Sequence, residues 1–204
     1  MTTFLLLRHA AHDWLPRGIA GRLPGVTLNG LGRAQARALA EPLAGAGISA
    51  IYSSPRERTQ ETAAPVAQRL KLPVLTAPEF DEIDFGAWMG LSFEELARDA
   101  ARWDHWVHRR ASATPPGGEP FAGVPLRARA GLDRLGRAHA GAVVLVVSHG
   151  DVIKALLAHT LGLSLDHLER FAIDPASLSV IEADGGGTRV RAVNAGAAGL
   201  PPLH

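Results

Sequence analysis

Two short apolar segments, each ending in a histidine, constrain the fold of this chain more than any other feature. Residues 4–7 run directly into Arg8 and His9, and residues 142–148 run into His149. Apolar runs of this length without polar alternation are typical of strands that are buried on both faces of a parallel sheet. Ligands of open α/β sheets bind beyond the carboxyl ends of the strands. We therefore expect Arg8, His9 and His149 to share one sheet edge.

A third apolar segment, residues 50–53, brings further cations to the same edge. Ser54 and Glu57 have the spacing of a capping box, and Pro55 suits the first position of a helix. A helix that starts here would direct its free N–H groups and the positive end of its dipole toward His9. The segment therefore predicts an anion-binding site.

Arg58 lies in the first turn of that helix, where a cation does not favour helix stability. It either binds an anion or pairs with Glu57 or Glu61 on a solvated face. A group of carboxylates farther along the chain is typical of an exposed acidic loop, and spacing alone does not say which of them is a proton donor. These carboxylates are Glu79, Asp81, Glu82 and Asp84.

The remaining pattern predicts helices and a final hairpin. Asn29 offers a cap for a helix that Gly45 ends, with Pro42 disturbing its last turn. Residues 92–110 form a helical stretch that carries Trp103 and Trp106 and resembles an insertion over the site. Further helices are expected over 126–139 and 152–161, and a hairpin over 178–183 and 189–193, with glycines 185–187 between its strands.

Composition narrows the class of protein. The chain has 204 residues, 47% of them hydrophobic, so we expect one domain with a real core over residues 1–204. Cysteine is absent, which excludes cysteine nucleophiles and thiolate metal sites. A net charge of +1 gives no general attraction to nucleic acid or to a membrane surface. Without a basic leader or a membrane-length apolar run, we expect a cytoplasmic protein.

Two histidines and two arginines at one sheet edge fit phosphoryl transfer. Guanidinium groups match the oxygens of a phosphoryl group in bidentate geometry, a role for Arg8 and Arg58. A neutral imidazole can attack phosphorus, which suits His9. His149, if protonated, would stabilise charge on the equatorial oxygens. The leaving alkoxide needs a proton, which a carboxylic acid with a raised pKa can supply.

Five motifs then identify a family resemblance. The chain resembles the histidine phosphatase superfamily, in its phosphoglycerate mutase-like branch, and the resemblance covers about residues 4 to 193. The motifs occur in the family's order, and they are Leu-Arg-His at 7–9, Ser-Ser-Pro-Arg-Glu-Arg-Thr-Gln-Glu-Thr-Ala at 53–63, Glu-Ile-Asp-Phe-Gly at 82–86, Pro-Gly-Gly-Glu at 116–119 and Ser-His-Gly at 148–150.

This resemblance implies a three-layer α/β/α sandwich around a mostly parallel sheet, with a small helical insertion, about residues 80–125, that caps the site. It implies no metal and no cofactor. It assigns His9 as the phosphorylated nucleophile and Glu82 as the proton donor. Arg8, Arg58 and His149 would form the phosphate pocket, and Gly150 is also expected to contact the substrate.

The chain departs from the family pattern at two places. The family commonly continues its first motif as Arg-His-Gly-Glu-Thr with an asparagine close behind, whereas this chain has Ala-Ala-His-Asp-Trp-Leu at 10–15. Leu15 cannot donate the hydrogen bond that the asparagine gives the phosphate. Pro120 stands where a serine often follows. These changes put substrate specificity in question more than activity.

Four functions are compatible with this pattern. The first is a phosphomonoesterase that acts through phosphohistidine on a small phosphate ester and releases phosphate. The second is a phosphoglycerate mutase, which the short insertion and the absence of asparagine at position 15 disfavour. The nine histidines suggest a metal-dependent hydrolase, but His105, His108 and the His12–Asp13 pair have no convincing ligand spacing. The fourth is a non-catalytic phosphate binder. It is disfavoured because such a protein would need neither His9 nor Glu82, and both are present.

The leaving alcohol and the oligomeric state do not follow from the sequence. Trp14, Trp88, Trp103 and Trp106 could line an entrance for a bulky leaving group or belong to the core. We expect some of five residues in the 103–109 segment to border the pocket mouth. They are Trp103, His105, Trp106, His108 and Arg109.

Overall fold

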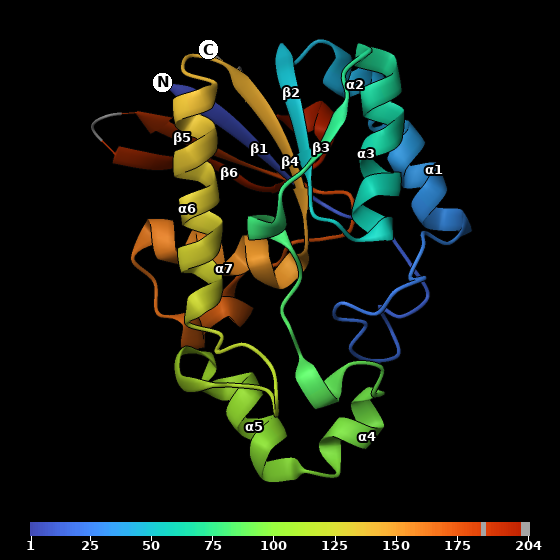
Figure 1. The fold of residues 1–204 in the computed structure, drawn as a ribbon, viewed down its shortest axis with the longest axis vertical. Coiled ribbons are helices and arrows are strands. Elements are labelled where there is room, and N and C mark those ends of the chain that lie inside the picture. The colour runs from blue at the N-terminus through green and yellow to red at the C-terminus, as the bar shows by residue number, and fades with distance from the viewer. Residues whose placement is uncertain (185–186, 201–204) are drawn as a thin grey trace.

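The computed structural model describes residues 1–184 and 187–200. Its centre is a mixed, mostly parallel sheet of six strands in the order β3-β2-β4-β1-β5-β6 (Figure 1). The first four of these run parallel to one another, β5 runs antiparallel to β1, and β6 runs antiparallel to β5. This confirms the α/β class. The strands are β1 (Thr2–Arg8), β2 (Ile48–Ser53), β3 (Val74–Thr76), β4 (Val143–Ser148), β5 (Leu178–Asp184) and β6 (Gly187–Ala195).

The two histidine-bearing strands, β1 and β4, are neighbours at the middle of the sheet. Their register pairs Phe4 with Val144 and Arg8 with Ser148, so both strands end at one level. Alternate residues face opposite sides: Phe4 belongs to one hydrophobic core and Leu5 to the other. Both side chains are fully buried. The unbroken apolar runs in the sequence therefore reflect burial on both faces.

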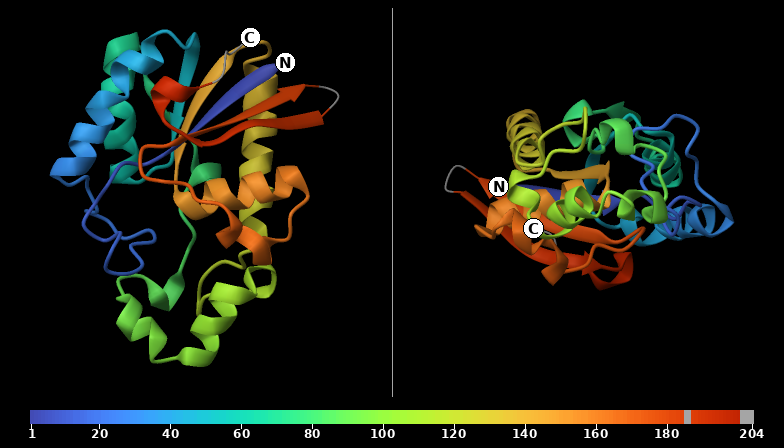
Figure 2. Two further views of the ribbon diagram at one scale, coloured as in Figure 1. Left: turned by 180° about the vertical axis from the view of Figure 1, so that it is seen from behind. Right: turned by 90° about the horizontal axis from the view of Figure 1, so that it is seen from below.

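Helices cover the two faces and form the outer layers. One core contains side chains from α2 and α3, and α1 packs against α3; the other core contains side chains from α6 and α7. Figure 2 shows this layered arrangement from behind and from below. The helices are α1 (Gly30–Ala38), α2 (Ala40–Ala44), α3 (Glu57–Leu70), α4 (Phe93–Ala97), α5 (Ala100–His108), α6 (Gly123–Ala138) and α7 (Gly150–Leu161).

Two expectations for helix ends have different outcomes. Asn29 caps α1 by accepting the N–H of Gly32, as predicted. The helix then breaks at Leu39, because Pro42 lacks the N–H that would bond to the carbonyl group four residues earlier. The capping box at Ser54 is wrong: α3 begins at Glu57 after Arg56, which provides no side-chain cap.

The segment between β3 and α6 lies at the opposite end of the molecule from the N-terminus (Figure 1). It contains α4, α5 and the short 3-10 helix η3 (Arg110–Ser112). Trp106 anchors it: this side chain is 2% exposed and meets Phe85, Trp88 and Phe121 edge to face, with ring centroids 5.3–5.7 Å apart. The aromatic cluster fixes the segment to the rest of the fold.

The last two strands form the expected hairpin, with β5 pairing β1. Residues 185 and 186 of its predicted glycine turn lie outside the described residues. Among the helices that the structure describes, none has the length and apolar character needed to cross a membrane.

The core makes a direct stability prediction. Leu145 is fully buried on β4, so Leu145→Ala should lower the free energy of unfolding by about 2–5 kcal/mol through lost burial and a residual cavity. Leu75, on the edge strand β3, is 42% exposed, and Leu75→Ala serves as the matched control with an expected change within about 0.5 kcal/mol. Urea unfolding monitored by circular dichroism measures both. Equal losses in the two variants would contradict this account of the core.

Candidate active site

Neighbouring parallel strands bring His9 and His149 together. The backbone N–H of His9 donates to the carbonyl of Ser148 over 2.9 Å, which continues the β1–β4 ladder to the strand ends. The two imidazole centroids lie 5.3 Å apart. Both rings are buried, with exposures of 2% for His9 and 0% for His149. The predicted meeting of the two distant histidines is confirmed.

The surroundings of His9 keep its ring neutral and orient it. Its Nδ1 lies 2.9 Å from the carbonyl oxygen of Ala10, which can only accept, so Nδ1 carries the proton. Burial, followed by the charges of Arg58 and Arg8, lowers the pKa of His9 well below its usual value. The Nε2 atom of His9 therefore keeps a free lone pair at neutral pH.

Arg58 is directed into the site from the first turn of α3. Its side chain is 1% exposed, and its Nη2 donates to the carbonyl of Gly21 over 2.8 Å. Glu57 and Glu61 instead accept backbone N–H groups, from Gly25 and Leu28. Pairing of Arg58 with these glutamates on a solvated face is therefore wrong.

Arg58 and Arg8 both offer unused hydrogen-bond donors. The buried Nε and Nη1 of Arg58 and the buried Nε of Arg8 have no partner in the part of the chain that the structure describes. The Nη1 of Arg8 donates to the carbonyl of Ile173. Buried N–H groups without partners are costly, so three such donors on two guanidinium groups favour a bound anion.

His149 is held by a chain of hydrogen bonds. Arg58 Nη2 donates to His149 Nδ1 over 3.1 Å, because a guanidinium group cannot accept. His149 Nε2 then donates to Ser54 Oγ over 2.8 Å, and Ser54 Oγ donates to Asp81 over 3.0 Å. Ser54, expected to cap α3, orients His149 instead. Burial and the Arg58 charge lower the pKa of His149 well below its usual value, so the ring is neutral at pH 7.

The Glu82 carboxyl group faces both Arg58 and His149. Its Oε2 lies 3.7 Å from Arg58 Nη2 and 3.5 Å from His149 Nδ1. Burial raises the pKa of Glu82 to about 7, although the Arg58 charge opposes the shift. A carboxyl group with this pKa can give and take a proton near neutral pH.

Two motifs that are far apart in the sequence meet to hold the Glu82 segment. The N–H of Glu119 donates to the carbonyl of Asp84 over 2.9 Å, and Ala87 donates to Pro116 over 2.8 Å. A Cβ atom on Gly118 would lie 2.2 Å from the carbonyl oxygen of Asp84, so this contact needs glycine. The Pro-Gly-Gly-Glu motif therefore serves as a support for the Glu82 loop.

The predicted exposed acidic loop is wrong, because its carboxylates are paired: Arg56 pairs with Asp81 at 2.9 Å and Arg134 with Glu79 at 2.7 Å. Arg22 supports the same loop by donating to the carbonyl of Glu82 over 2.7 Å and to Glu119 over 2.9 Å. Arg127 adds a second contact to Glu119 at 2.9 Å. Arg22 was not identified from the sequence, because it lies in a glycine- and proline-rich loop without periodicity. Only the fold brings it to this position.

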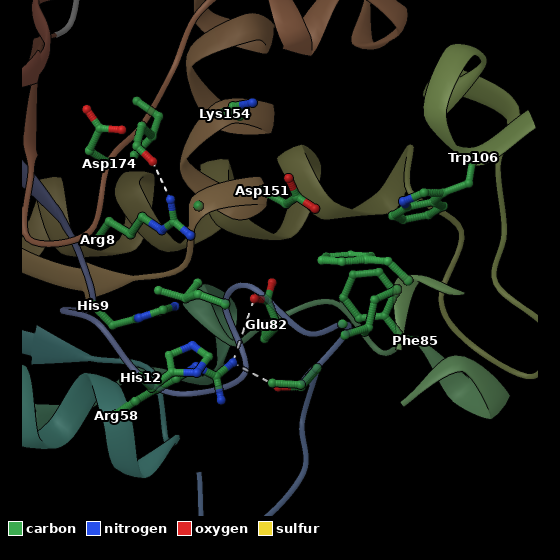
Figure 3. Close-up of a pocket in the computed structure, with 18 of the residues that line it drawn as sticks. Arg8, His9, His12, Arg58, Glu82, Phe85, Trp106, Asp151, Lys154 and Asp174 are labelled. Atoms are coloured by element: carbon green, nitrogen blue, oxygen red, sulfur yellow. Dashed lines mark hydrogen bonds and ion pairs between the residues drawn. The ribbon is translucent and has the colours of Figure 1, made fainter. Parts of the chain in front are cut away.

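The site opens into a cavity of about 430 Å³ between the strand ends and the α4–α5 segment (Figure 3). Trp103 and Trp106 line it, as expected for the pocket mouth. His105, His108 and Arg109 do not. Leu15 also lines the cavity, where it contributes an apolar surface.

The cavity has further lining residues that the sequence did not single out. Asp151 and Lys154 come from the start of α7, and Arg110 comes from η3. Arg110 is 9% exposed, stacks 4.3 Å from the Trp106 ring and pairs with Asp151 at 3.2 Å. Asp151 follows the Ser-His-Gly motif at a strand end, a position that could have indicated it. Gly150 lines the cavity too. A Cβ atom at this position would lie 3.0 Å from Arg8 Nε.

His9, Glu82 and His149 also have the spacing of a metal site, since one ligand atom from each lies within 4.8 Å of the others. Arg58 lies 3.7 Å from Glu82 and 3.1 Å from His149, however. A fixed positive charge this close opposes a cation at the same point, so the electrostatics favour an anion.

Comparisons with known proteins agree with this geometry. The family model for the histidine phosphatase superfamily (branch 1) matches residues 4–196. A bifunctional protein of Mycobacterium tuberculosis is 45% identical over 202 residues, covering 95% of this chain and 54% of that protein. The chain thus spans about half the length of this relative.

Two further proteins are similar over most of both lengths. Phosphoserine phosphatase 1 of Hydrogenobacter thermophilus is 34% identical over 185 residues, which covers 90% of this chain and 88% of that protein. The solved structure of YhfR from Bacillus stearothermophilus has a TM-score of 0.89 and 32% identity, covering 94% of this chain and 96% of that one. With the family model matching nearly the whole chain, this protein belongs to the histidine phosphatase superfamily.

Proposed function

We propose that this protein is a phosphomonoesterase that acts through a phosphohistidine intermediate on a small phosphorylated metabolite. The observation that carries the proposal is the set of unpaired, buried guanidinium N–H groups of Arg8 and Arg58 beside the neutral ring of His9. An anion with several oxygens satisfies these donors, and a free imidazole lone pair faces it. Membership of a phosphatase superfamily and similarity to a protein named phosphoserine phosphatase support the same class.

The first step transfers the phosphoryl group to the enzyme. The Nε2 lone pair of His9 attacks phosphorus, and the bond from phosphorus to the ester oxygen breaks. Glu82 in its acid form gives its proton to the departing alkoxide, so that a neutral alcohol leaves. Arg8 and Arg58 stabilise the charge on the equatorial oxygens. A phosphoryl dianion next to His149 would also raise the pKa of that ring and favour its protonated form.

The second step returns the enzyme to its starting state. A water molecule attacks the phosphorus of phosphohistidine, and Glu82, now a carboxylate, takes a proton from that water. The bond from phosphorus to His9 Nε2 breaks, which restores the neutral imidazole and releases inorganic phosphate. A pKa of about 7 suits Glu82 to both roles, because each form is substantially populated near neutral pH.

We further propose that residues 80–125 act as a cap on a single catalytic domain. This segment carries Glu82, Trp103 and Trp106, and the cavity lies between it and the strand ends. The alcohol part of the substrate would contact the tryptophans, Arg110 and Lys154. Variation in the cap would then change substrate choice without changing the phosphate pocket.

A phosphoglycerate mutase is the second candidate. Arg110 and Lys154 line the outer cavity, where two cations suit the carboxylate of a sugar acid. Both already pair with acidic side chains, Arg110 with Asp151 at 3.2 Å and Lys154 with Glu169 at 3.2 Å. Because these acidic partners partly neutralise the two cations, a substrate carboxylate gains less from them, which favours the phosphatase over the mutase.

The two candidates are separated by one assay. We expect hydrolysis of a panel of phosphomonoesters to exceed the interconversion of 3-phosphoglycerate and 2-phosphoglycerate, measured with catalytic bisphosphoglycerate present. Phosphate release and isomer formation are followed in parallel by ³¹P NMR. Isomer formation at a rate equal to or above hydrolysis would reverse the assignment.

The intermediate is tested by covalent labelling at His9. After rapid mixing with p-nitrophenyl phosphate and alkaline quenching, intact mass spectrometry should show the added mass of one phosphoryl group, stable in base and labile in acid. His9→Ala should remove the label and nearly all turnover, because the nucleophile is lost. A strong chelator should leave turnover unchanged. Label or turnover that persists in His9→Ala would refute this mechanism.

The pH dependence tests the role of Glu82. Because its raised pKa is about 7, the acid form dominates below pH 7, and kcat/KM for an alkyl phosphate should fall up to tenfold per unit above it. Glu82→Gln should lower kcat/KM for glycerol phosphate by about 10²- to 10⁴-fold and flatten that alkaline limb. The loss should be much smaller with p-nitrophenyl phosphate, whose phenolate leaves without a proton. An unchanged alkaline limb in Glu82→Gln would assign the acid to another group.

A further inference from the structure

His12 is a buried imidazole in the site to which the proposed mechanism gives no role. The side chain is 4% exposed and lines the cavity directly after β1. Its ring centroid lies 4.9 Å from that of His9, with the planes inclined at 44°. Figure 3 shows the ring beside His9 and the guanidinium group of Arg58.

One ring nitrogen of His12 already accepts a hydrogen bond from the protein. The backbone N–H of Trp14 donates to His12 Nδ1 over 3.3 Å, so this nitrogen presents its lone pair. A neutral imidazole with an accepting Nδ1 carries its proton on Nε2. Burial, with the charges of Arg58 and Arg8, lowers the pKa of His12 to about 4, and nearby Asp13 opposes the shift. At neutral pH the ring is therefore an uncharged donor in a fixed orientation.

The phosphate pocket needs such a donor. His149 has no N–H to offer in its neutral form, because Nδ1 accepts from Arg58 and Nε2 donates to Ser54. His9 Nδ1 bonds to the carbonyl of Ala10, and His9 Nε2 is the attacking atom. Among the imidazoles of the described site, His12 alone has a ring N–H without a partner in the structure. An uncharged donor also adds no further repulsion between the buried cations.

We propose that the Nε2–H of His12 donates a hydrogen bond to an oxygen of the phosphoryl group held between Arg8 and Arg58. This role rests on the proposed phosphatase function and adds a substrate-contacting residue to it. His12 would bind both the phosphate ester and the transferring phosphoryl group, as well as inorganic phosphate and orthovanadate, which share the same oxygens.

Three substitutions separate the donor from the shape of the ring. His12→Phe keeps the ring volume and removes both nitrogens. His12→Gln places an amide N–H near the position of Nε2. His12→Asn keeps an acceptor for the Trp14 N–H and lacks the distant donor, so it preserves the test if His12→Phe does not fold.

The readouts are kcat/KM with p-nitrophenyl phosphate, the inhibition constant of orthovanadate, and calorimetric binding of inorganic phosphate. A hydrogen bond to a charged group is worth about a 10- to 100-fold change. We expect His12→Phe and His12→Asn to lose that factor in kcat/KM and to bind vanadate and phosphate more weakly by a similar factor. His12→Gln should recover at least about fivefold over His12→Phe.

Several outcomes would overturn the proposal. One is vanadate and phosphate affinity in His12→Phe and His12→Asn within twofold of the unmodified protein. Another is an equal loss in all three variants, because a loss that the amide N–H of His12→Gln does not reduce cannot be assigned to the missing donor. Failure of the phosphatase function itself gives a different result: the unmodified protein would neither turn over p-nitrophenyl phosphate nor form the His9 label. Phosphate binding would then still measure the contribution of His12.

Discussion

The burial of two guanidinium groups at one sheet edge is the constraint on which the site depends. Arg8 and Arg58 leave buried N–H groups without partners, a costly arrangement in a low-dielectric interior. The fold offsets part of that cost with the carbonyl groups of Ile173 and Gly21 and with Glu82. The remaining unpartnered N–H groups would be satisfied by an anion, and for this reason we propose that phosphate binds there.

Burial and the charge of Arg58 set the protonation of the histidines in the site. They lower the pKa of His9, His12 and His149, and Arg8 adds to the shift for His9 and His12, so all three rings are uncharged at neutral pH. Burial acts on Glu82 in the opposite sense and raises its pKa to about 7. One desolvated pocket therefore holds neutral imidazoles beside a carboxyl group with a raised pKa, because burial always disfavours the charged form.

Local sequence signals predicted the parts of the site that lie on regular elements. The apolar runs before His9 and His149 predicted two buried strands and a shared edge, and both predictions are confirmed. They succeeded because strand burial on both faces leaves an unbroken apolar run, and because parallel strands deliver their carboxyl ends to one side. The capping box at Ser54 failed because the hydroxyl group has stronger partners in the tertiary structure, His149 and Asp81.

The sequence by itself determined the strands, the α/β layering and the family motifs that contain His9, Arg58 and His149. Tertiary structure decided which carboxylate faces the histidines, since Glu82 differs from its acidic neighbours only in its partners and burial. It also decided that Arg58 is buried instead of solvated, that Arg22 supports the Glu82 loop, and that His12 lines the cavity beside His9. The physical reason is that hydrophobic periodicity is local, whereas desolvation and charge pairing depend on groups that only the folded chain brings together.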